Sequence, residues 1–297
     1  MVASVLESRV DIQGGQLAVF AVGAGEPVIF LHGGPGDTHH YMKRMAEPFY
    51  SSTLKSTYQF IFFDQRGTGA STLKSRSKEN FHPELLFDDL QRVRRKFTSG
   101  PVRLVGHSWG AMYGLYACMH SSEDYSHAAL LNMGPLDSEM ERLSGEALLA
   151  AMGPSSHQAW QELRLKRNSA RDQSDFKTVE DCDRQMMQLR VKSWIFDPEL
   201  RATFLEDYFF DPPPDREVNK YIWEAQSNWF KWENVARAKS KIWLLAGSHD
   251  ATPLQQFHRL NSELPKSTLT VFEECGHIPW LEKPDLFYRD LSFALNS

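Results

Sequence analysis

A serine framed by two glycines lies directly after a run of apolar residues. The segment Gly106-His107-Ser108-Trp109-Gly110 follows the apolar run 102–105 and begins a helix-like stretch. A strand, a sharp turn and a helix are what a Gly-x-Ser-x-Gly nucleophile elbow requires, because that turn presents the serine hydroxyl at the top of a sheet. Glycines suit the two flanking positions because a Cβ there would collide with the neighbouring strand or helix. We therefore predict that Ser108 is a nucleophile.

A serine hydroxyl is a weak nucleophile at neutral pH, so it needs a base, and that base needs an acid to orient it. Asp250 and His277 follow the predicted strands 242–246 and 269–272. The carboxyl ends of parallel strands lie at the same edge of a sheet, where open α/β sheets place their sites. The order serine, acid, histidine predicts Asp250 as the acid and His277 as the base. Asp137, just beyond an earlier strand, is the alternative acid.

A glycine-rich loop follows the first of these predicted buried strands. It reads His32-Gly33-Gly34-Pro35-Gly36, after the apolar run 28–31. Attack on a carbonyl develops negative charge on its oxygen, and backbone N–H groups that face this oxygen stabilise it. We predict that the amides of Gly34 and Trp109 form this oxyanion hole.

The segments that would position these residues alternate between strand-like and helix-like patterns. Near-continuous apolar runs are typical of strands buried on both faces of a parallel sheet. They occur at 28–31, 60–63, 102–105, 128–133, 242–246 and 269–272. Helix-like stretches occur at 41–54, 83–97, 109–120, 254–264 and 284–295. The alternation predicts an α/β fold with a mostly parallel, doubly wound sheet. The stretches 4–12 and 16–22 predict an antiparallel hairpin at one edge.

The alternation stops between residues 134 and 239. This segment shows helical periodicity, an interruption at Asp211-Pro212-Pro213-Pro214 and no convincing strand. We predict a core of residues 1–133 and 240–297 with an inserted helical cap, or lid, at 134–239. Aromatic residues crowd the second half of the insertion, where they would either line an apolar pocket under a lid or pack within the lid itself. They are Trp194, Phe196, Phe204, Tyr208, Phe209, Phe210, Tyr221, Trp223, Trp229, Phe230 and Trp232.

Composition excludes several classes of protein. A net charge of −5 does not favour binding to the phosphate backbone of a nucleic acid, and 41% hydrophobic residues argue against disorder. No apolar run is long enough to span a membrane, and the first residues lack the apolar core of a signal peptide. Three cysteines without zinc-ligand spacing fit a reduced, cytoplasmic protein. No cofactor or metal motif occurs, so we expect neither cofactor nor metal, and a small-molecule or short-peptide substrate.

Three motifs together resemble those of the proline iminopeptidases, a family of the α/β-hydrolase superfamily. These are the loop 32–36, the segment Asp64-Gln65-Arg66-Gly67-Thr68-Gly69-Ala70-Ser71 and the elbow 106–110. The resemblance implies an α/β-hydrolase fold and metal-free release of an N-terminal residue, typically proline, from short peptides. It also implies that carboxylates of the cap bind the free amine of the substrate, for which Trp223 and Glu224 resemble the Trp-Glu pair of the family. His107 departs from the small residue that the family usually has before the serine.

Two other functions remain open from the sequence. A carboxylester or lactone hydrolase, or an acyltransferase, would use the same machinery under a differently lined cap. A small-molecule receptor would use the fold without catalysis, which the intact triad disfavours. We expect the neighbouring polar residues to be structural: Asp64 and Arg66 bracing loops by an ion pair, and His107 and His249 with side chains that point away from the catalytic residues beside them.

Overall fold

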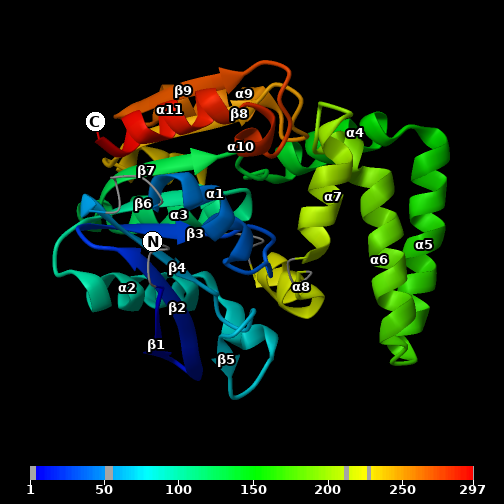
Figure 1. Ribbon diagram of the computed structural model, residues 1–297, viewed down its shortest axis with the longest axis horizontal. Coiled ribbons are helices and arrows are strands. Elements are labelled where there is room, and N and C mark those ends of the chain that lie inside the picture. The colour runs from blue at the N-terminus through cyan, green and yellow to red at the C-terminus, as the bar shows by residue number, and fades with distance from the viewer. Residues whose placement is uncertain (1–4, 51–55, 211–213, 226–228, 297) are drawn as a thin grey trace.

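The computed structural model describes residues 5–50, 56–210, 214–225 and 229–296 of the 297-residue chain. In these residues nine strands form one sheet in the order β1-β2-β4-β3-β6-β7-β8-β9, with β5 paired to β2 (Figure 1). The pairs of β2 are antiparallel, and all pairs from β4 to β9 are parallel. The strands are β1 Leu6–Ile12, β2 Gly15–Gly23, β3 Glu26–Leu31, β4 Tyr58–Phe63, β5 Thr72–Leu73, β6 Val102–His107, β7 Tyr125–Leu131, β8 Lys241–Gly247 and β9 Ser267–Phe272.

Helices cover both faces of this sheet. Successive side chains of a strand point to opposite faces. Ile29 and Leu31 belong to the apolar cluster formed with α2, α3 and α9, whereas Val28 and Phe30 belong to the cluster formed with α1 and α11. The helices are α1 His40–Tyr50, α2 Pro83–Phe97, α3 Trp109–His120, α9 Leu254–Glu263, α10 Pro279–Glu282 and α11 Pro284–Asn296. Burial on two faces explains the near-continuous apolar runs, and the predicted mostly parallel, doubly wound sheet is confirmed.

The predicted elements match the structure closely, with a few differences at their ends. Helices α2 and α3 have the predicted bounds, and the hairpin of β1 and β2 turns at Gly14, whose φ is +83°. The strand predicted at 128–133 ends at Leu131 because Asn132, with φ +43°, leaves the extended conformation. Residues 51–54 of the predicted helix 41–54 lie outside the described residues. The two-residue strand β5 had not been predicted.

The described residues between β7 and β8 form helices and loops that lie beside the sheet. Figure 1 shows α4 to α7 at one end of the molecule, with α8 between them and the core. They are α4 Ser138–Met152, α5 Pro154–Asp172, α6 Phe176–Arg190, α7 Leu200–Phe210 and α8 Arg216–Ala225, with the 3-10 turns Val191–Ser193 and Trp232–Arg237. Residues Asp211 to Pro213 of the predicted interruption lie outside the described residues. We call residues 134–239 the cap.

The cap is attached to the glycine-rich loop of the core. Asn219 of α8 donates from Nδ2 to the carbonyl of Pro35 at 2.7 Å, and the amide of Asp215 donates to the carbonyl of Gly36 at 2.8 Å. A Cβ on Gly36, whose φ is +96°, would lie 2.6 Å from the carbonyl oxygen of Asp215. Only glycine allows this close approach, so the loop sequence itself permits the cap to contact the core here.

None of the described helices combines the length and the apolar character that a membrane crossing needs. The three cysteines, Cys118, Cys182 and Cys275, are buried free thiols. Burial raises the pKa of the Cys118 thiol to about 12, so this side chain behaves as a core residue.

Candidate active site

Ser108 occupies a strained turn between β6 and α3. Its φ of +56° and ψ of −123° are unusual for a residue other than glycine. The chain can turn here because its neighbours lack side chains. A Cβ on Gly106 would lie 2.4 Å from the carbonyl oxygen of Gly110, and a Cβ on Gly110 would lie 2.0 Å from that of Leu31. The predicted elbow is therefore present at the carboxyl end of β6.

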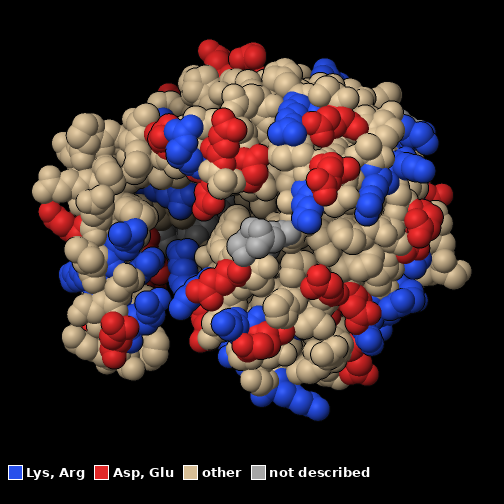
Figure 2. Space-filling model, turned by 180° about the vertical axis from the view of Figure 1, so that it is seen from behind, with Lys and Arg blue, Asp and Glu red and all other residues tan. Residues whose placement is uncertain are grey.

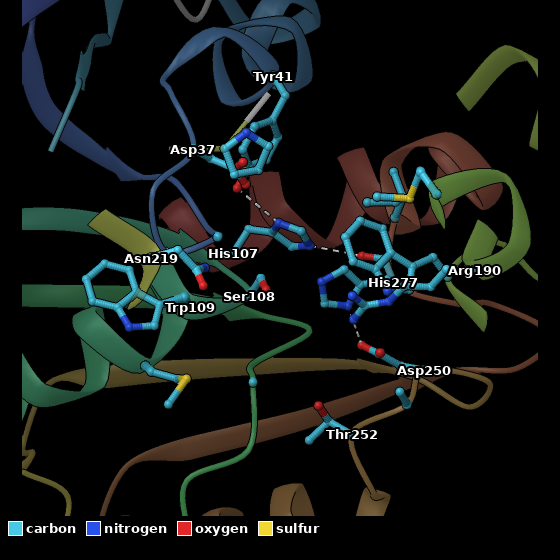
Figure 3. Close-up of a pocket in the computed structure, with 18 of the residues that line it drawn as sticks. Asp37, Tyr41, His107, Ser108, Trp109, Arg190, Asn219, Asp250, Thr252 and His277 are labelled. Carbon is cyan, nitrogen blue, oxygen red and sulfur yellow. Dashed lines mark hydrogen bonds and ion pairs between the residues drawn. The ribbon is translucent and has the colours of Figure 1, made fainter. Parts of the chain in front are cut away.

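Asp250 and His277 meet beside this turn. They follow β8 and β9, which are parallel neighbours in the sheet, and His277 Nδ1 lies 2.8 Å from Asp250 Oδ2. An ionised carboxylate only accepts hydrogen bonds, so Nδ1 is the donor and Nε2 is the nitrogen that can take a proton from the serine. In Figure 3 the imidazole lies between Ser108 and Asp250. This is the arrangement of a nucleophile, a base and an orienting acid.

The second candidate acid lies elsewhere. Asp137 accepts hydrogen bonds from the amide of Met140 at 2.8 Å and from Trp232 Nε1 at 2.7 Å. It therefore caps the first turn of α4 and ties the start of the cap to its end. The geometry places Asp250, and not Asp137, against His277.

Asn132 supports Asp250, and sequence reasoning missed it. Its Nδ2 donates to Asp250 Oδ2 at 2.8 Å and to the carbonyl of Gly276 at 2.9 Å. Burial alone would raise the pKa of Asp250, but the charge of His277 and the hydrogen bonds from His277 and Asn132 hold it below its ordinary value. Asp250 is therefore ionised at neutral pH.

His107 joins the elbow to the base. Its Nε2 donates to the carbonyl of His277 at 2.9 Å, and its Nδ1 lies 3.2 Å from the hydroxyl of Tyr41. Burial, helped by the neighbouring His277, lowers the pKa of His107 to about 3. A neutral ring that donates from Nε2 must accept at Nδ1, so Tyr41 is the donor there. His107 therefore has a structural role, which is to hold the backbone of the residue predicted as the base.

The glycine-rich loop faces the same site. The amide of Gly33 donates to the hydroxyl oxygen of Tyr41 at 2.6 Å, so this amide is not available to a substrate. The amides of Gly34 and Trp109 make no hydrogen bond within the described part of the chain. Gly34, with φ +108°, allows the loop to turn toward Ser108. The two amides predicted for the oxyanion hole both border the cavity described next.

A cavity of about 490 Å³ opens onto Ser108, Asp250 and His277. From the core it is lined by Gly34, helix α1, the elbow and the loops that carry Asp250 and His277, and the cap covers it. From the cap it is lined by Ser144, Leu148, Met187, Arg190, Trp194, Phe204, Pro214, Arg216, Asn219 and Trp223. A mostly apolar lining around a few polar groups is typical of small-molecule sites. Residues of the segment between β7 and β8 thus line this cavity together with residues of the core.

Only part of the aromatic group predicted for the pocket reaches it. Trp194, Phe204 and Trp223 line the cavity, whereas Trp229 and Phe230 pack against the core. The side chains of residues 208–210 lie outside the described residues. Aromatic composition alone therefore could not separate residues that line the pocket from those that attach the cap.

Glu224, predicted to bind a substrate amine, does not line the cavity. Trp223 does, but Glu224 is exposed and its carboxylate lies 3.8 Å from Lys220 Nζ. The two residues are one turn apart on α8, so this is a surface ion pair of an ordinary kind. Of the described residues that line the cavity, Asp37 is the one carboxylate outside the catalytic pair.

Basic residues from both the core and the cap line the cavity. They are Arg44 of α1, Arg190 of α6 and Arg216 of α8. Figure 2 shows a hollow between the cap and the core with Lys or Arg side chains on its walls. In the described ranges no three His, Cys, Asp or Glu side chains come together in a way that could hold a metal ion.

Asp64 and Arg66 brace loops as expected, but not by pairing with each other. Asp64 accepts from His39 Nδ1 at 2.8 Å and from the amide of Ala70 at 2.8 Å. Arg66 binds both oxygens of Asp89, each at 2.7 Å. The ion pair predicted within the segment is wrong because each side chain has a buried partner elsewhere: His39, just before α1, for Asp64 and Asp89 of α2 for Arg66. A local sequence gives no sign of such long-range partners.

Comparison with known proteins places this geometry among hydrolases. The family model described as "Alpha/beta hydrolase family" matches residues 28–290. A proline iminopeptidase of Clostridium botulinum is 29% identical over 287 residues, covering 92% of this chain and 91% of that protein. The solved proline iminopeptidase of Mycobacterium smegmatis aligns with a TM-score of 0.69 at 19% identity, over 98% of both chains. An esterase from Exiguobacterium antarcticum aligns equally well, with a TM-score of 0.69 at 18% identity, over 98% of this chain and 100% of the other.

Proposed function

The chain belongs to the alpha/beta hydrolase family, and on that premise we propose that it is a serine hydrolase that acts through an acyl-enzyme. The observation that supports this most directly is the meeting of Ser108, His277 and Asp250 at one cavity. Asp250 fixes the tautomer of His277, whose Nε2 is then the base for the serine hydroxyl. The strained backbone of Ser108 holds the nucleophile at the N-terminus of α3, where the first backbone amides of the helix are exposed.

The reaction takes place in two matched halves. Ser108 Oγ bonds to the substrate carbonyl carbon as its proton passes to His277 Nε2, and the amides of Gly34 and Trp109 stabilise the oxyanion. The bond to the leaving group then breaks, and the leaving group takes the proton from His277. Water repeats the sequence: it gives a proton to His277, bonds to the acyl carbon and releases Ser108, which regains the proton. Nucleophilic catalysis thus divides one difficult displacement into two easier steps.

For the substrate, we propose an N-terminal proline or another apolar residue of a short peptide. The proline iminopeptidase relatives and the apolar side chains of the cavity support this choice. An ammonium group inside such a cavity needs a carboxylate partner, because an unpaired buried charge is costly. Trp223 remains a proposed substrate contact. Since Glu224 lies outside the cavity, we assign the ammonium to Asp37.

A carboxylester or lactone hydrolase, or an acyltransferase, is the second candidate. The observation that favours it is the basic lining by Arg44, Arg190 and Arg216, which does not attract an ammonium group. A neutral ester or lactone has no ammonium to accommodate, and the same triad would cleave it.

One assay separates the two candidates. Wild-type protein is tested side by side on proline p-nitroanilide, other aminoacyl p-nitroanilides and short p-nitrophenyl esters. The aminopeptidase proposal expects the proline anilide to have the highest kcat/KM, and robust ester cleavage without anilide cleavage overturns it. Ser108→Ala should lower kcat at least about 10³-fold on every substrate. Activity should survive EDTA, and loss that zinc restores would contradict the serine mechanism.

A further inference from the structure

We propose that Arg190 binds a carboxylate carried by the leaving group of the substrate. This inference rests on the serine-hydrolase function proposed above and narrows its substrate class. It predicts that the preferred substrates are anionic on the side of the scissile bond that departs: short peptides with a free C-terminus, or esters whose alcohol carries a carboxylate.

The first reason is the position of Arg190 beside the base. Arg190 is the last residue of α6, and its guanidinium carbon lies 4.9 Å from the centre of the Trp194 ring. The Trp194 ring lies 5.2 Å from the His277 ring, and the carbonyl of Trp194 accepts the amide of His277 at 2.7 Å. Arg190 is thereby fixed to the loop that carries the base, even though it belongs to the cap.

The second reason is the direction in which the leaving group departs. His277 gives its proton to the leaving group, so that group must lie on the His277 side of the acyl carbon. The oxyanion faces the other way, toward the amide of Trp109. In Figure 3 Arg190 lies on the same side of Ser108 as His277, and Trp109 lies on the other side. Arg190 is therefore placed to meet the leaving group rather than the acyl oxygen.

The third reason is the chemistry of the arginine. A guanidinium group is planar, and its in-plane N–H groups match the two oxygens of a carboxylate. The contact with the Trp194 ring limits the positions that this guanidinium group can take. Arg216 also lines the cavity, but its Nη2 lies 3.6 Å from Asp183, which Arg167 binds at 3.0 Å. Of the three arginines that line the cavity, Arg190 is the one whose guanidinium lies over Trp194, the ring next to His277.

The charge of the cavity agrees with this assignment. Among the described lining residues, arginines outnumber carboxylates: Arg44, Arg190 and Arg216 against Asp37 and Asp250. A dipeptide with both ends free carries an ammonium in its acyl part and a carboxylate in its leaving part. Asp37 and Arg190 would then recognise the two ends of one molecule, which sets an upper limit on substrate length.

Two matched substrate pairs test the proposal, one for each candidate function. They are prolyl-glycine with prolyl-glycinamide, and 3-acetoxybenzoate with its methyl ester. Each pair shares its scissile bond and differs in the carboxylate of the leaving group. Wild-type kcat/KM should favour the carboxylate member of the pair it hydrolyses by about 10-fold or more, because a charge-assisted hydrogen bond is gained. The preference should shrink at high salt, where such an attraction is screened.

Substitutions test whether the preference for a carboxylate depends on Arg190 in particular. Arg190→Gln should remove most of the preference, so that the loss on the carboxylate member exceeds the loss on the neutral member by about 10-fold, and Arg190→Lys should retain part of it. Arg184→Gln is the matched control: Arg184 lies on the same helix but is exposed, 3.5 Å from Glu180, and its loss should leave both rates at the wild-type level. Thermal unfolding of each variant verifies that it is folded.

The outcomes distinguish this inference from the proposed function. Equal wild-type rates on both members of a hydrolysed pair, or equal losses on both in Arg190→Gln, overturn the role of Arg190 and leave the serine hydrolase intact. Hydrolysis that persists in Ser108→Ala, or no hydrolysis of either pair, contradicts the proposed function and this inference with it.

Discussion

His107 Nε2 lies 2.9 Å from the backbone carbonyl of His277, so the residue before the nucleophile holds the backbone of the base. The donors and acceptors of the neighbouring hydrogen bonds follow from this contact. A carbonyl accepts, so Nε2 carries the proton, and Nδ1 then accepts from the hydroxyl of Tyr41. The oxygen of Tyr41 in turn accepts the amide of Gly33. This series of hydrogen bonds connects the glycine-rich loop, the elbow and the base.

Tyr41→Phe should lower kcat about 10-fold with little change in KM. The substitution leaves the amide of Gly33 and Nδ1 of His107 without partners, at about 1–3 kcal/mol for each buried group, and it loosens the loop beside the oxyanion. Steady-state kinetics measures the effect. Tyr288→Phe is the control, because its hydroxyl also binds a backbone carbonyl, that of Met45 at 3.2 Å, and Tyr288 itself is not among the residues that line the cavity. A wild-type kcat in Tyr41→Phe would show that the hydrogen bonds through Tyr41 do not position the catalytic residues.

Asn132→Gly should lower kcat/KM about 10-fold. Glycine accepts the positive φ of this position, so the variant removes the hydrogen bonds to Asp250 and Gly276 without adding backbone strain. Asn132→Asp should be more harmful, because a second carboxylate raises the pKa of Asp250. The acid limb of its profile of kcat/KM against pH should therefore move to higher pH. A glycine variant with wild-type kcat/KM would remove Asn132 from the site.

The sequence predicted those features that depend on local pattern. The elbow, the two catalytic turns and the bounds of α2 and α3 follow from apolar runs and the glycines that punctuate them. Asp250 and His277 could be placed together because parallel neighbouring strands end at the same edge of a sheet. These inferences need only the order of the elements along the chain.

The rest depends on contacts that no local pattern contains. Asn132 meets Asp250 from a position 118 residues away, and His107 meets His277 from 170 residues away. The prediction of Glu224 follows from the Trp-Glu pair that it resembles, but the face of α8 on which a residue lies is set by packing on the core. Strand β5, with two residues, is too short to show a period.

The stability of the protein should fall as the pH decreases from about 6.5 to about 4. His32 is buried, donates from Nδ1 to the carbonyl of Gly33 and accepts at Nε2 from the amide of Gln65, each at 3.1 Å. Burial, against the opposing charge of Asp64, lowers the pKa of His32 to about 4. The unfolded chain therefore binds more protons than the folded chain in this window, and each such histidine costs about 1.4 kcal/mol per pH unit.

Urea unfolding at several pH values measures this slope. His32→Gln supplies a donor and an acceptor but cannot take up a proton. The slope of its free energy of unfolding against pH should therefore be smaller than that of the wild type, by an amount equivalent to up to about one bound proton. His258→Gln, a change at an exposed histidine, should leave the slope as it is. If His32→Gln has the wild-type slope, the acid sensitivity arises at other groups, of which His107 is the first to test.

Glu282 joins the cap to the loop that carries the base. One carboxylate oxygen accepts the amide of Gly276 at 2.8 Å, and the other accepts the amides of Phe196 and Asp197 at 2.7 and 3.2 Å. Gly276 can approach this closely because it has no side chain: a Cβ there would lie 2.2 Å from the carbonyl oxygen of Trp194. Both oxygens are therefore used, one on each side of the junction between cap and core.

Glu282→Gln should weaken that junction, because the amide group of glutamine turns an N–H donor toward backbone donors. We expect kcat to fall about 10-fold and the Tm to fall by about 2–6 °C, from the loss of one or two charge-assisted hydrogen bonds. Limited proteolysis should cut the cap faster in this variant. Glu263→Gln is the control, since Glu263 pairs with Arg259 at 2.8 Å on the surface of α9, and surface pairs contribute little. Equal effects of the two substitutions would mean that Glu282 does not hold the cap on the site, because a surface carboxylate would then matter as much as one bonded to three amides of the junction.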